Sequence, residues 1–300
     1  MKKDLLCIAD LSEEEILKLF TLAKSLKERR KRGEKIVPLL FGKVLGMLFR
    51  KPSTRTRISF EVGMFELGGR AIFLTDQNLQ ISRGETISDT AKVLSSYLDG
   101  ILIRTSKQEE VEEFAKYSEI PIINGLSDTY HPCQVLSDYF TLWEKRELKK
   151  IKVTYIGDGN NVCHSLISGA DKLGVRLSVV TPKEYPPKKE ILARVRNKKR
   201  ITLSHNPCDI RDSDVIYTDT WISMGAEKEK EKRIAVFKDY QLNKKLLKKA
   251  KKELLVMHCL PAHRGEEITD EVMDAPFSIV FEQAVNRLHL QKAILATLLK

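Results

Sequence analysis

The sequence contains no apolar run long enough to cross a membrane. The apolar stretch from residue 37 to 49 is interrupted by Lys43, and it is shorter than the about 20 residues that a transmembrane helix needs. The opening residues 1–4 are charged and lead into only a few apolar residues, so they do not predict a signal peptide. We therefore expect a cytoplasmic protein that does not act at a membrane.

Metal-binding and dinucleotide-binding motifs are also lacking. The five cysteines are scattered, odd in number and without a C-x-x-C pair, which argues against a disulfide framework or a structural zinc site. His258, Cys259 and His263 do not have the spacing of metal ligands, and the loop 157–161 is not the G-x-G-x-x-G of a dinucleotide site. We predict no metal, no cofactor and reduced thiols.

What the sequence does have is length and positive charge. Its 300 residues exceed the usual size of one domain. A net charge of +11 has two interpretations: a nucleic-acid-binding surface, which would bind in a salt-sensitive manner, or solvated helix faces rich in both Lys and Glu. The basic stretches lack interleaved aromatic residues. We therefore favour solvated faces and predict no nucleic-acid partner.

Short apolar segments alternate with segments of helical periodicity, and this pattern predicts an α/β protein with parallel sheets flanked by helices. The predicted strands are 44–49, 71–74, 100–104, 121–124, 151–156, 176–180, 201–204, 215–218 and 254–258. The predicted helices are 11–32, 53–67, 86–97, 111–117, 132–147, 162–173, 191–197 and 283–299. The pattern restarts after residue 147, which indicates a domain boundary there.

The segment from Ser53 to Arg57 predicts a phosphate site. It lies where a predicted strand ends and a helix begins, and the first turn of a helix offers backbone N–H groups and a positive dipole to an anion. Ser53, Thr54 and Thr56 add hydroxyl groups, and Arg55 and Arg57 add guanidinium groups that suit phosphate oxygens. An ordinary N-cap with surface arginines is the simpler alternative, but five consecutive anion-binding residues favour the phosphate site.

Arg104, His131 and Gln134 are predicted near the same edge of the sheet. Arg104 ends a predicted strand, and His131 and Gln134 begin the long helix after another strand. In parallel α/β sheets the ligand crevice lies beyond the carboxyl ends of the strands. His131 could donate a hydrogen bond to a carbonyl oxygen, and Gln134 could hold an amide.

Four motifs, in order along residues 49–287, resemble those of the aspartate and ornithine carbamoyltransferases. The segment 53–57 is similar to the family's carbamoyl phosphate signature, and His-Pro-Cys-Gln at 131–134 to the second motif of the ornithine branch. The aspartate branch usually has Thr or Ser where Cys133 stands. Residues 219–225 are similar to the ornithine-binding D-x-x-x-S-M-G loop, and 258–262 to the family's H-C-L-P-A stretch.

The resemblance implies transfer of a carbamoyl group from carbamoyl phosphate to the δ-amine of L-ornithine, giving L-citrulline and phosphate. Arginine biosynthesis is the commoner role in the family, and arginine degradation stays open as the alternative. It implies a carbamoyl phosphate-binding domain at 1–147, to which a C-terminal helix at 285–300 returns, and an ornithine-binding domain at 148–284. It also implies a homotrimer or a multiple of trimers, with active sites between subunits. Putrescine, acetylornithine and aspartate stay open as other amine substrates.

The resemblance also implies roles for single residues. Those expected at carbamoyl phosphate are Ser53, Thr54, Arg55, Thr56, Arg57, Gln80, Arg104, His131, Gln134, Cys259, Leu260 and Arg287. Gln80 is expected to reach the phosphate of a neighbouring subunit. Those expected at ornithine are Asn161, Asp219, Ser223 and Met224. Arg55, Arg104, His131 and Cys259 are the expected catalytic residues.

Overall fold

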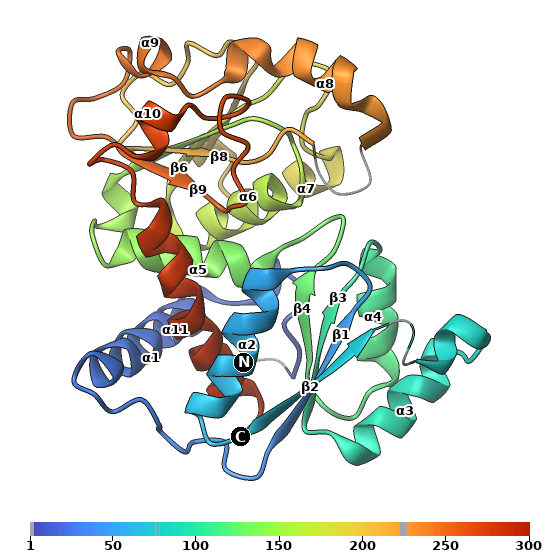
Figure 1. Ribbon diagram of the computed structural model, residues 1–300. Coiled ribbons are helices and arrows are strands. Elements are labelled where there is room, and N and C mark those ends of the chain that lie inside the picture. The colour runs from blue at the N-terminus through green and yellow to red at the C-terminus, as the bar shows by residue number, and fades with distance from the viewer. Residues whose placement is uncertain (1–2, 76, 78, 223–226) are drawn as a thin grey trace. The chain divides into compact units, whose positions relative to one another are not determined.

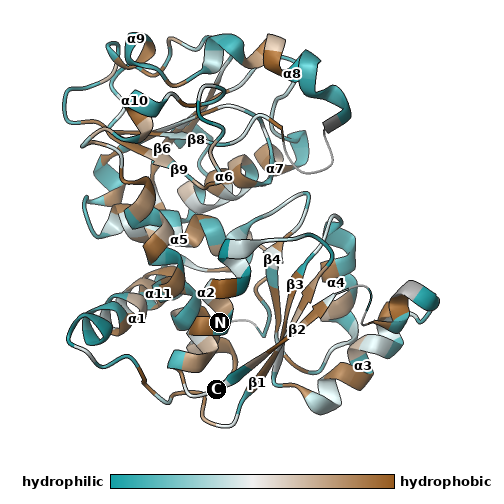
Figure 2. Ribbon diagram, viewed as in Figure 1, coloured by the Kyte–Doolittle hydropathy of each residue, from teal (hydrophilic) through white to brown (hydrophobic). Residues whose placement is uncertain are grey.

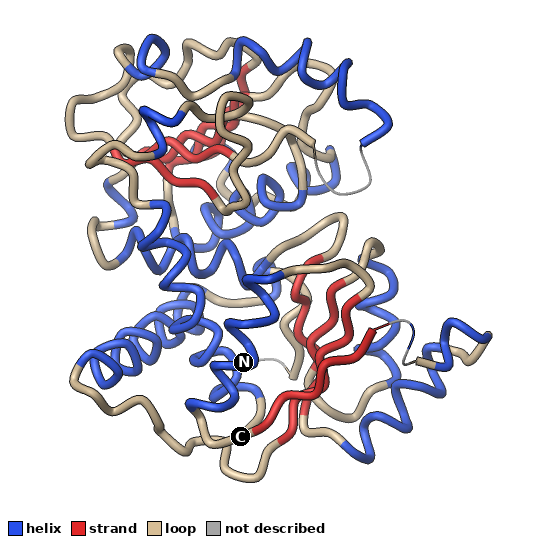
Figure 3. Tube along the Cα trace, viewed as in Figure 1, coloured by secondary structure: helices blue, strands red, loops and turns tan. Residues whose placement is uncertain are grey.

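The chain folds into two units, each organised around its own parallel sheet (Figures 1 and 3). The computed structural model describes residues 3–75, 77, 79–222 and 227–300. One unit comprises residues 1–140 and 286–300, and the other comprises residues 141–285. The two divisions therefore fall inside helices, one within α5 (Pro132–Trp143) and one within α11 (Val280–Leu298).

The first unit is built around a four-stranded parallel sheet in the order β2-β1-β3-β4. Its strands are β1 (Val44–Phe49), β2 (Arg70–Thr75), β3 (Gly100–Arg104) and β4 (Ile122–Leu126). Its helices, besides its parts of α5 and α11, are α1 (Glu13–Lys31), α2 (Thr54–Glu66), α3 (Ile87–Tyr97) and α4 (Gln108–Tyr117). Figure 1 shows α3 and α4 on one face of the sheet, and α2, α11 and α1 on the other.

The second unit is built around a five-stranded parallel sheet in the order β7-β6-β5-β8-β9. Its strands are β5 (Lys152–Ile156), β6 (Arg176–Val180), β7 (Ile201–Ser204), β8 (Val215–Thr218) and β9 (Leu255–His258). Its own helices are α6 (Asn161–Leu173), α7 (Lys189–Ala193), α8 (Lys230–Phe237), α9 (Lys244–Leu247) and α10 (Asp270–Met273). Figure 1 shows α6 and α7 on one face of the sheet and α8 on the other.

Apolar strands covered by helices on both faces supply the core of each unit, and Figure 2 shows the strands mainly in the hydrophobic colour. In the first unit, Ile101, Ile103 and Ile122 pack with Val111 and Phe114 of α4. Parallel sheets buried on both faces have near-continuous apolar strands, and β3 fits this rule because all five of its residues are buried.

Local sequence signals explain several helix ends. Ser12 and Glu15 form a capping box at the start of α1, with Glu15 N–H donating to Ser12 Oγ at 3.1 Å and Ser12 N–H donating to Glu15 Oε2 at 2.8 Å. Helix α11 packs closely on α2 where α2 has a glycine, because a Cβ added at Gly63 would lie only 3.4 Å from Lys292 Cγ. The C-terminal helix thus packs against the N-terminal helices, as predicted.

The predicted fold class is confirmed, whereas some helix bounds were wrong. Helix α5 ends at Trp143 instead of residue 147. A turn begins directly after Trp143, and Lys145 in this turn pairs with Glu282 at 2.7 Å. Helix α7 ends at Ala193 instead of residue 197, because the carboxylate of Asp171 accepts the N–H groups of residues 196 and 197. Helices α8 and α9 lie in the basic stretch 228–252, which was predicted only to form solvated helix faces without bounds, and α10 was not predicted.

None of the helices in the described part of the chain combines the length and the apolar character that crossing a bilayer requires.

Candidate active site

The junction between β1 and α2 has the geometry of an anion site. Ser53 is extended (φ −163°, ψ 115°) and caps α2, with its Oγ accepting the N–H of Thr56 at 3.2 Å. No acidic residue lies in the first turn of this 13-residue helix. The positive end of the helix dipole and the outward N–H groups of the first turn are therefore not neutralised by a carboxylate from their own helix.

Three arginines and a histidine gather at this junction. Burial first, and then the charges of Arg287 and Arg55, lower the pKa of Arg104 to about 10. Burial and the charges of the same three arginines, Arg287 foremost, hold the pKa of His131 well below its usual range. No carboxylate of the described residues contributes to either shift. The cluster therefore concentrates positive charge and keeps the imidazole of His131 neutral.

Residues far apart in the sequence build this cluster. Arg287 comes from α11, and its Nη2 donates to Oγ1 of the fully buried Thr56 at 2.9 Å. Arg104 ends β3, only 5% of it is exposed, and among the described residues its Nε has no hydrogen-bond partner. A buried N–H group without an acceptor costs free energy unless a ligand supplies one. The arrangement therefore calls for an anionic or carbonyl ligand.

The start of α5 adds polar groups to the first unit. His131 precedes the helix and is buried, and Gln134 is buried with its Nε2 donating to Asp138 Oδ1 at 2.8 Å. Cys133 lies between them, with its thiol 3.4 Å from the carbonyl oxygen of Asn124. Burial raises the pKa of Cys133 to about 12, so this thiol stays protonated and is not a nucleophile.

The structure places three of the predicted residues of the first unit in more exposed positions. Arg57 donates to Glu61 at 2.9 Å and stacks on the ring of Phe73 at 3.8 Å, so its guanidinium has partners outside the arginine cluster. Thr54 is exposed in the first turn of α2. Gln80 is exposed at the start of the short 3-10 helix from Gln80 to Arg83.

In the second unit, the carboxylate of Asp219 is the centre of a buried hydrogen-bond network. Asp219 follows β8, is 4% exposed, and accepts from Asn160 Nδ2, Cys259 Sγ and the N–H of Thr220, each at 2.7 Å. Asn160 also caps α6, since its Oδ1 accepts the N–H groups of Val162 and Cys163. The sequence interpretation named Asn161, the first residue of α6, and missed Asn160, although an Asn directly before a helical segment is a strong N-cap signal.

The segment after β9 has an unusual backbone beside this carboxylate. Cys259 is buried and donates to Asp219, and Leu260 is half-buried with a φ of +59°. A positive φ is rare for a residue other than glycine and is typical of functional sites. The structure therefore brings together Asp219, Cys259 and Leu260, all three of which the sequence predicted.

An ion pair between Arg233 and Asp158 connects α8 to the segments that follow β5 and β8 in the second unit. Arg233 of α8 donates through Nη1 to Asp158 at 2.9 Å and to the carbonyl oxygen of Trp221 at 2.8 Å, and it stacks on Tyr185. Burial raises the pKa of Asp158 to about 6, against the lowering effect of Arg233. This pair was not predicted. Ser223 and Met224, which were predicted at ornithine, lie outside the described residues.

Two groups of potential metal ligands occur among the described residues. Asp219, His258 and Cys259 form one group, and His263, Glu266 and Glu267 form the other. In the first group the thiol donates to Asp219, and both nitrogens of His258 are hydrogen bonded, one to Glu267 and one to the N–H of Leu260. In the first group, the thiol of Cys259 and both ring nitrogens of His258 are therefore already engaged in hydrogen bonds within the protein.

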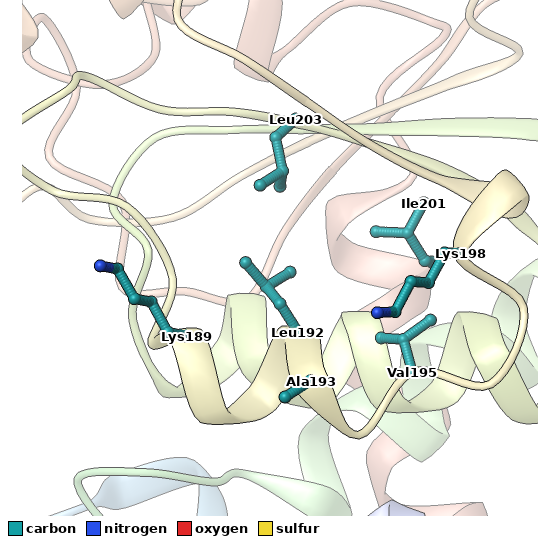
Figure 4. Close-up of a pocket in the computed structure, with 7 residues that line it drawn as sticks. All are labelled: Lys189, Leu192, Ala193, Val195, Lys198, Ile201 and Leu203. Carbon is teal, nitrogen blue, oxygen red and sulfur yellow. The ribbon is translucent and has the colours of Figure 1, made fainter.

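A groove lies between α7 and β7 of the second unit (Figure 4). Its volume is about 380 Å³, and Figure 4 shows Leu192 and Leu203 pointing toward one another across it. The lining residues are Lys189, Leu192, Ala193, Val195, Lys198, Ile201 and Leu203. None of them belongs to the predicted site.

Comparison with known families matches both parts of the chain to one family. Residues 3–144 match the carbamoyl-P binding domain of the aspartate/ornithine carbamoyltransferases. Residues 149–298 match the Asp/Orn binding domain of the same family.

Individual relatives agree with this match. The chain is 52% identical to a protein of Pyrococcus horikoshii named ornithine carbamoyltransferase, over 99% of this chain and 96% of the relative. It is also 52% identical to a protein of Pyrococcus furiosus named ornithine carbamoyltransferase, anabolic, over 98% and 95% of the two chains. A solved structure of the ornithine carbamoyltransferase of Pyrococcus furiosus superposes with a TM-score of 0.94, covering 98% of this chain and 96% of the other.

Proposed function

Because the chain belongs to the aspartate/ornithine carbamoyltransferase family, we propose that it transfers the carbamoyl group of carbamoyl phosphate to the δ-amine of L-ornithine. The products are L-citrulline and phosphate. The relative named anabolic supports a role in arginine biosynthesis. The proposal assigns carbamoyl phosphate to a domain of residues 1–147 and 285–300, and ornithine to a domain of residues 148–284.

One observation carries this proposal: the cationic cluster at the start of α2. Arg55, Arg104 and Arg287 lower the pKa of His131, and within the described part of the chain no carboxylate opposes them. Such a cluster is stable when an anion with several oxygen atoms binds to it. The phosphate of carbamoyl phosphate is such an anion, and the helix N-terminus supports it with N–H groups.

The proposed carbamoyl phosphate-binding residues follow from this cluster and the family motifs. Within it the phosphate contacts the first turn of α2, and the carbamoyl end contacts Arg104, His131 and Gln134. The full proposed set is Ser53, Thr54, Arg55, Thr56, Arg57, Gln80, Arg104, His131, Gln134, Cys259, Leu260 and Arg287. Arg57 contributes least, because Glu61 and Phe73 already hold its guanidinium.

The proposed ornithine-binding residues are Asn161, Asp219, Ser223 and Met224. The carboxylate of Asp219 suits the α-ammonium group of the substrate, and Asn160 holds that carboxylate in place at 2.7 Å. Asn161 begins α6, so a substrate carboxylate beside it meets the positive end of a 13-residue helix.

The chemical step is direct transfer without a covalent enzyme intermediate. The neutral δ-amine attacks the carbamoyl carbon, the new C–N bond forms, the C–O bond to phosphate breaks, and the proton lost by the amine leaves with the phosphate. Negative charge grows on the carbamoyl oxygen and then on phosphate. Arg55 and Arg104 stabilise it with charge, and the neutral His131 donates a hydrogen bond.

The amine has to lose its own proton before it attacks. A side-chain amine of the lysine type has a pKa of about 10.4 in water. Desolvation and nearby cations both lower such a pKa. The arginine cluster therefore favours the reactive form of the amine as well as the binding of phosphate.

A citrulline assay with two arginine variants tests the proposal. Arg55→Ala removes a cluster guanidinium, and we expect kcat to fall by about 100-fold or more, the usual loss for one group that stabilises the transition state. Arg29→Ala removes a guanidinium of α1 that pairs with the exposed Glu34, and we expect turnover within about threefold of wild type, because an exposed pair contributes little. Near-normal turnover of Arg55→Ala in folded protein would refute the assignment.

The amine substrate is tested separately. Ornithine, putrescine, acetylornithine and aspartate are each supplied with carbamoyl phosphate, and carbamoylated product and phosphate are measured. The carboxylate of Asp219 predicts a preference for an amine that also carries an α-ammonium group, which putrescine and acetylornithine lack. If any of the other three amines has a higher kcat/KM than ornithine, that amine and not ornithine is the substrate.

We also propose a homotrimer, or a multiple of trimers, with active sites shared between subunits. Phe41 is 85% exposed and Phe65 of α2 is 68% exposed, and Ile58 of α2 and Ile72 of β2 add further exposed apolar surface. These four residues fall within residues 41–72 of the chain, and exposed apolar surface favours association. Phe65→Glu is expected to shift the mass measured by light scattering toward the monomer; an unchanged mass would place the interface elsewhere.

We propose a cytoplasmic location, in agreement with the five cysteines, none of which forms a disulfide. Thiols that are not oxidised to disulfides are typical of a reducing compartment.

A further inference from the structure

A buried histidine and glutamate lie directly behind the unusual backbone at Leu260. His258 Nδ1 accepts the N–H of Leu260 at 2.8 Å, and His258 Nε2 lies 3.0 Å from Glu267 Oε1. Both side chains are fully buried. Glu267 Oε1 also accepts the N–H of His263 at 2.5 Å, which holds the carboxylate in place.

These contacts allow only one tautomer of His258. A ring nitrogen that accepts an N–H must carry a lone pair, so Nδ1 of His258 is unprotonated. The ring proton is then on Nε2 and is donated to Glu267. Both oxygens of a carboxylate are acceptors, so Glu267 stabilises this tautomer and excludes the alternative, in which Nδ1–H would face the N–H of Leu260.

The tautomer fixes the orientation of a peptide plane in the candidate site. In a trans peptide the N–H and the preceding C=O point in opposite directions. The N–H of Leu260 points to His258, so the carbonyl oxygen of Cys259 points away from it. The side chain of Cys259 donates to Asp219, so this peptide belongs to the group of residues proposed to contact the substrates.

We propose that Glu267 is a positioning residue of the transfer reaction: it fixes the Nε2–H tautomer of His258, which holds the Leu260 N–H and so orients the carbonyl oxygen of Cys259 toward the reacting amine. This inference rests on the proposed function. The feature that Glu267 supplies is an acceptor for the ring N–H of His258, and its negative charge is secondary.

A matched pair of variants separates the acceptor from the charge. Glu267→Gln removes the charge and keeps an acceptor oxygen, so we expect kcat within about threefold of wild type. Glu267→Met has a similar shape and no such acceptor, and we expect kcat to fall by about tenfold, the loss of one well-placed hydrogen bond. Glu266→Met changes the adjacent, half-buried carboxylate and serves as the control.

Nitrogen-15 spectra of the histidines report the tautomer of His258, which a purely structural role of Glu267 would leave unchanged. In protein labelled with 15N-histidine, His258 should show an unprotonated Nδ1 in wild type and in Glu267→Gln, and a mixture of tautomers in Glu267→Met. Equal kcat for the three Glu267 forms, or an unchanged tautomer in Glu267→Met, would overturn the proposal.

A second pair of variants applies if Glu267→Met does not fold. His258→Asn keeps an acceptor, its Oδ1, close to the position of Nδ1, whereas His258→Leu has none. Turnover per folded molecule should stay within about threefold of wild type for Asn and fall about tenfold or more for Leu, since only Leu leaves the Leu260 N–H without a partner. Equal turnover of the two would overturn the proposal.

The proposed function and this inference fail in different ways. If wild-type protein forms no citrulline, the proposed function is wrong. If wild type is active and the acceptor-free variants are equally active, only the role of Glu267 is wrong.

Discussion

His131 and His289 are both buried beside cations, and both are held neutral for that reason. Burial and then the charge of Lys292 lower the pKa of His289 to about 3. Burial and the charges of three arginines hold the pKa of His131 well below its usual range. For His289 the consequence concerns the stability of the fold. For His131 it concerns the candidate site, where a neutral ring donates a hydrogen bond without adding to the repulsion among the arginines.

His289 should make the protein less stable in mild acid. Its pKa is about 6.5 when unfolded and about 3 when folded. Between these values the unfolded chain binds a proton that the folded chain does not, so the stabilisation that is complete above pH 6.5 is lost as pH falls toward 3. The expected slope from this residue is up to about 1.4 kcal/mol per pH unit.

Urea unfolding of wild type and His289→Gln at pH 7, 6 and 5 checks this prediction. Taking the difference between the two proteins removes the contribution of other groups, such as Asp158, whose pKa is raised to about 6. The advantage of wild type over the variant should shrink as pH falls. A difference that is constant across the three pH values would contradict the assignment of this pKa shift to His289.

Residue type and position along the chain predict the candidate residues that lie at strand ends, but not the contacts between them. Arg104 ends a strand and Asp219 directly follows one, and the parallel arrangement brings them to the ligand edge of their sheets. The hydrogen bond from Arg287 to Thr56 joins residues 231 positions apart. The tautomer of His258 depends on Glu267, which no local pattern marks.

At the level of helices, a single carboxylate joins three elements of the first unit. Glu66, at the end of α2, lies 2.7 Å from Arg30 of α1 and 2.6 Å from Lys292 of α11. Lys292 is 1% exposed and Glu66 is 3% exposed. The same pair of helices, α2 and α11, carries Thr56 and Arg287, so this ion pair helps to fix the packing on which the arginine cluster depends.

Glu66→Gln should therefore be strongly destabilising. It leaves the buried ammonium of Lys292 without a carboxylate, and we expect the free energy of unfolding to fall by about 3–5 kcal/mol. Glu61→Gln, on the same helix, removes the exposed partner of Arg57 and should cost less than about 1 kcal/mol. Urea unfolding at pH 7 compares them, and equal losses would show that Glu66 has no special role in the packing.

Sheet elements were predicted more completely than helices, for a physical reason. Strands such as 44–49 and 100–104 are buried apolar segments between polar turns, and their bounds are those observed. Helix α8 lies in the charged segment 228–252, where the apolar residues are few, and its burial depends on Phe237 packing with Trp221 and Tyr240. The amino-acid composition does not reveal that α5 and α11 each continue through a division between the units.

At the level of the whole molecule, shared active sites make a distinct prediction. If Gln80 of one subunit completes the phosphate site of its neighbour, Gln80→Ala and Arg55→Ala are each nearly inactive alone. Unfolding the two variants together and refolding the mixture should restore activity, because a subunit with intact Arg55 then receives an intact Gln80 from its neighbour.

A matched mixture provides the control for this experiment. Arg55→Ala mixed with Arg104→Ala should regain nothing, because the charge of Arg55 acts on Arg104 within one chain. Turnover is measured as citrulline formed per milligram after refolding. Equal recovery in the two mixtures, or no recovery in either, would contradict a site completed by Gln80 of a neighbour.

The most direct test of the central claim is a crystal structure with a bisubstrate analogue that joins a phosphonate to ornithine. The account predicts phosphonate oxygens within about 3 Å of the first-turn N–H groups of α2 and of the Arg55 guanidinium. It also predicts the ornithine end beside Asp219. A phosphonate bound elsewhere on the basic surface, with the start of α2 facing solvent alone, would contradict the account.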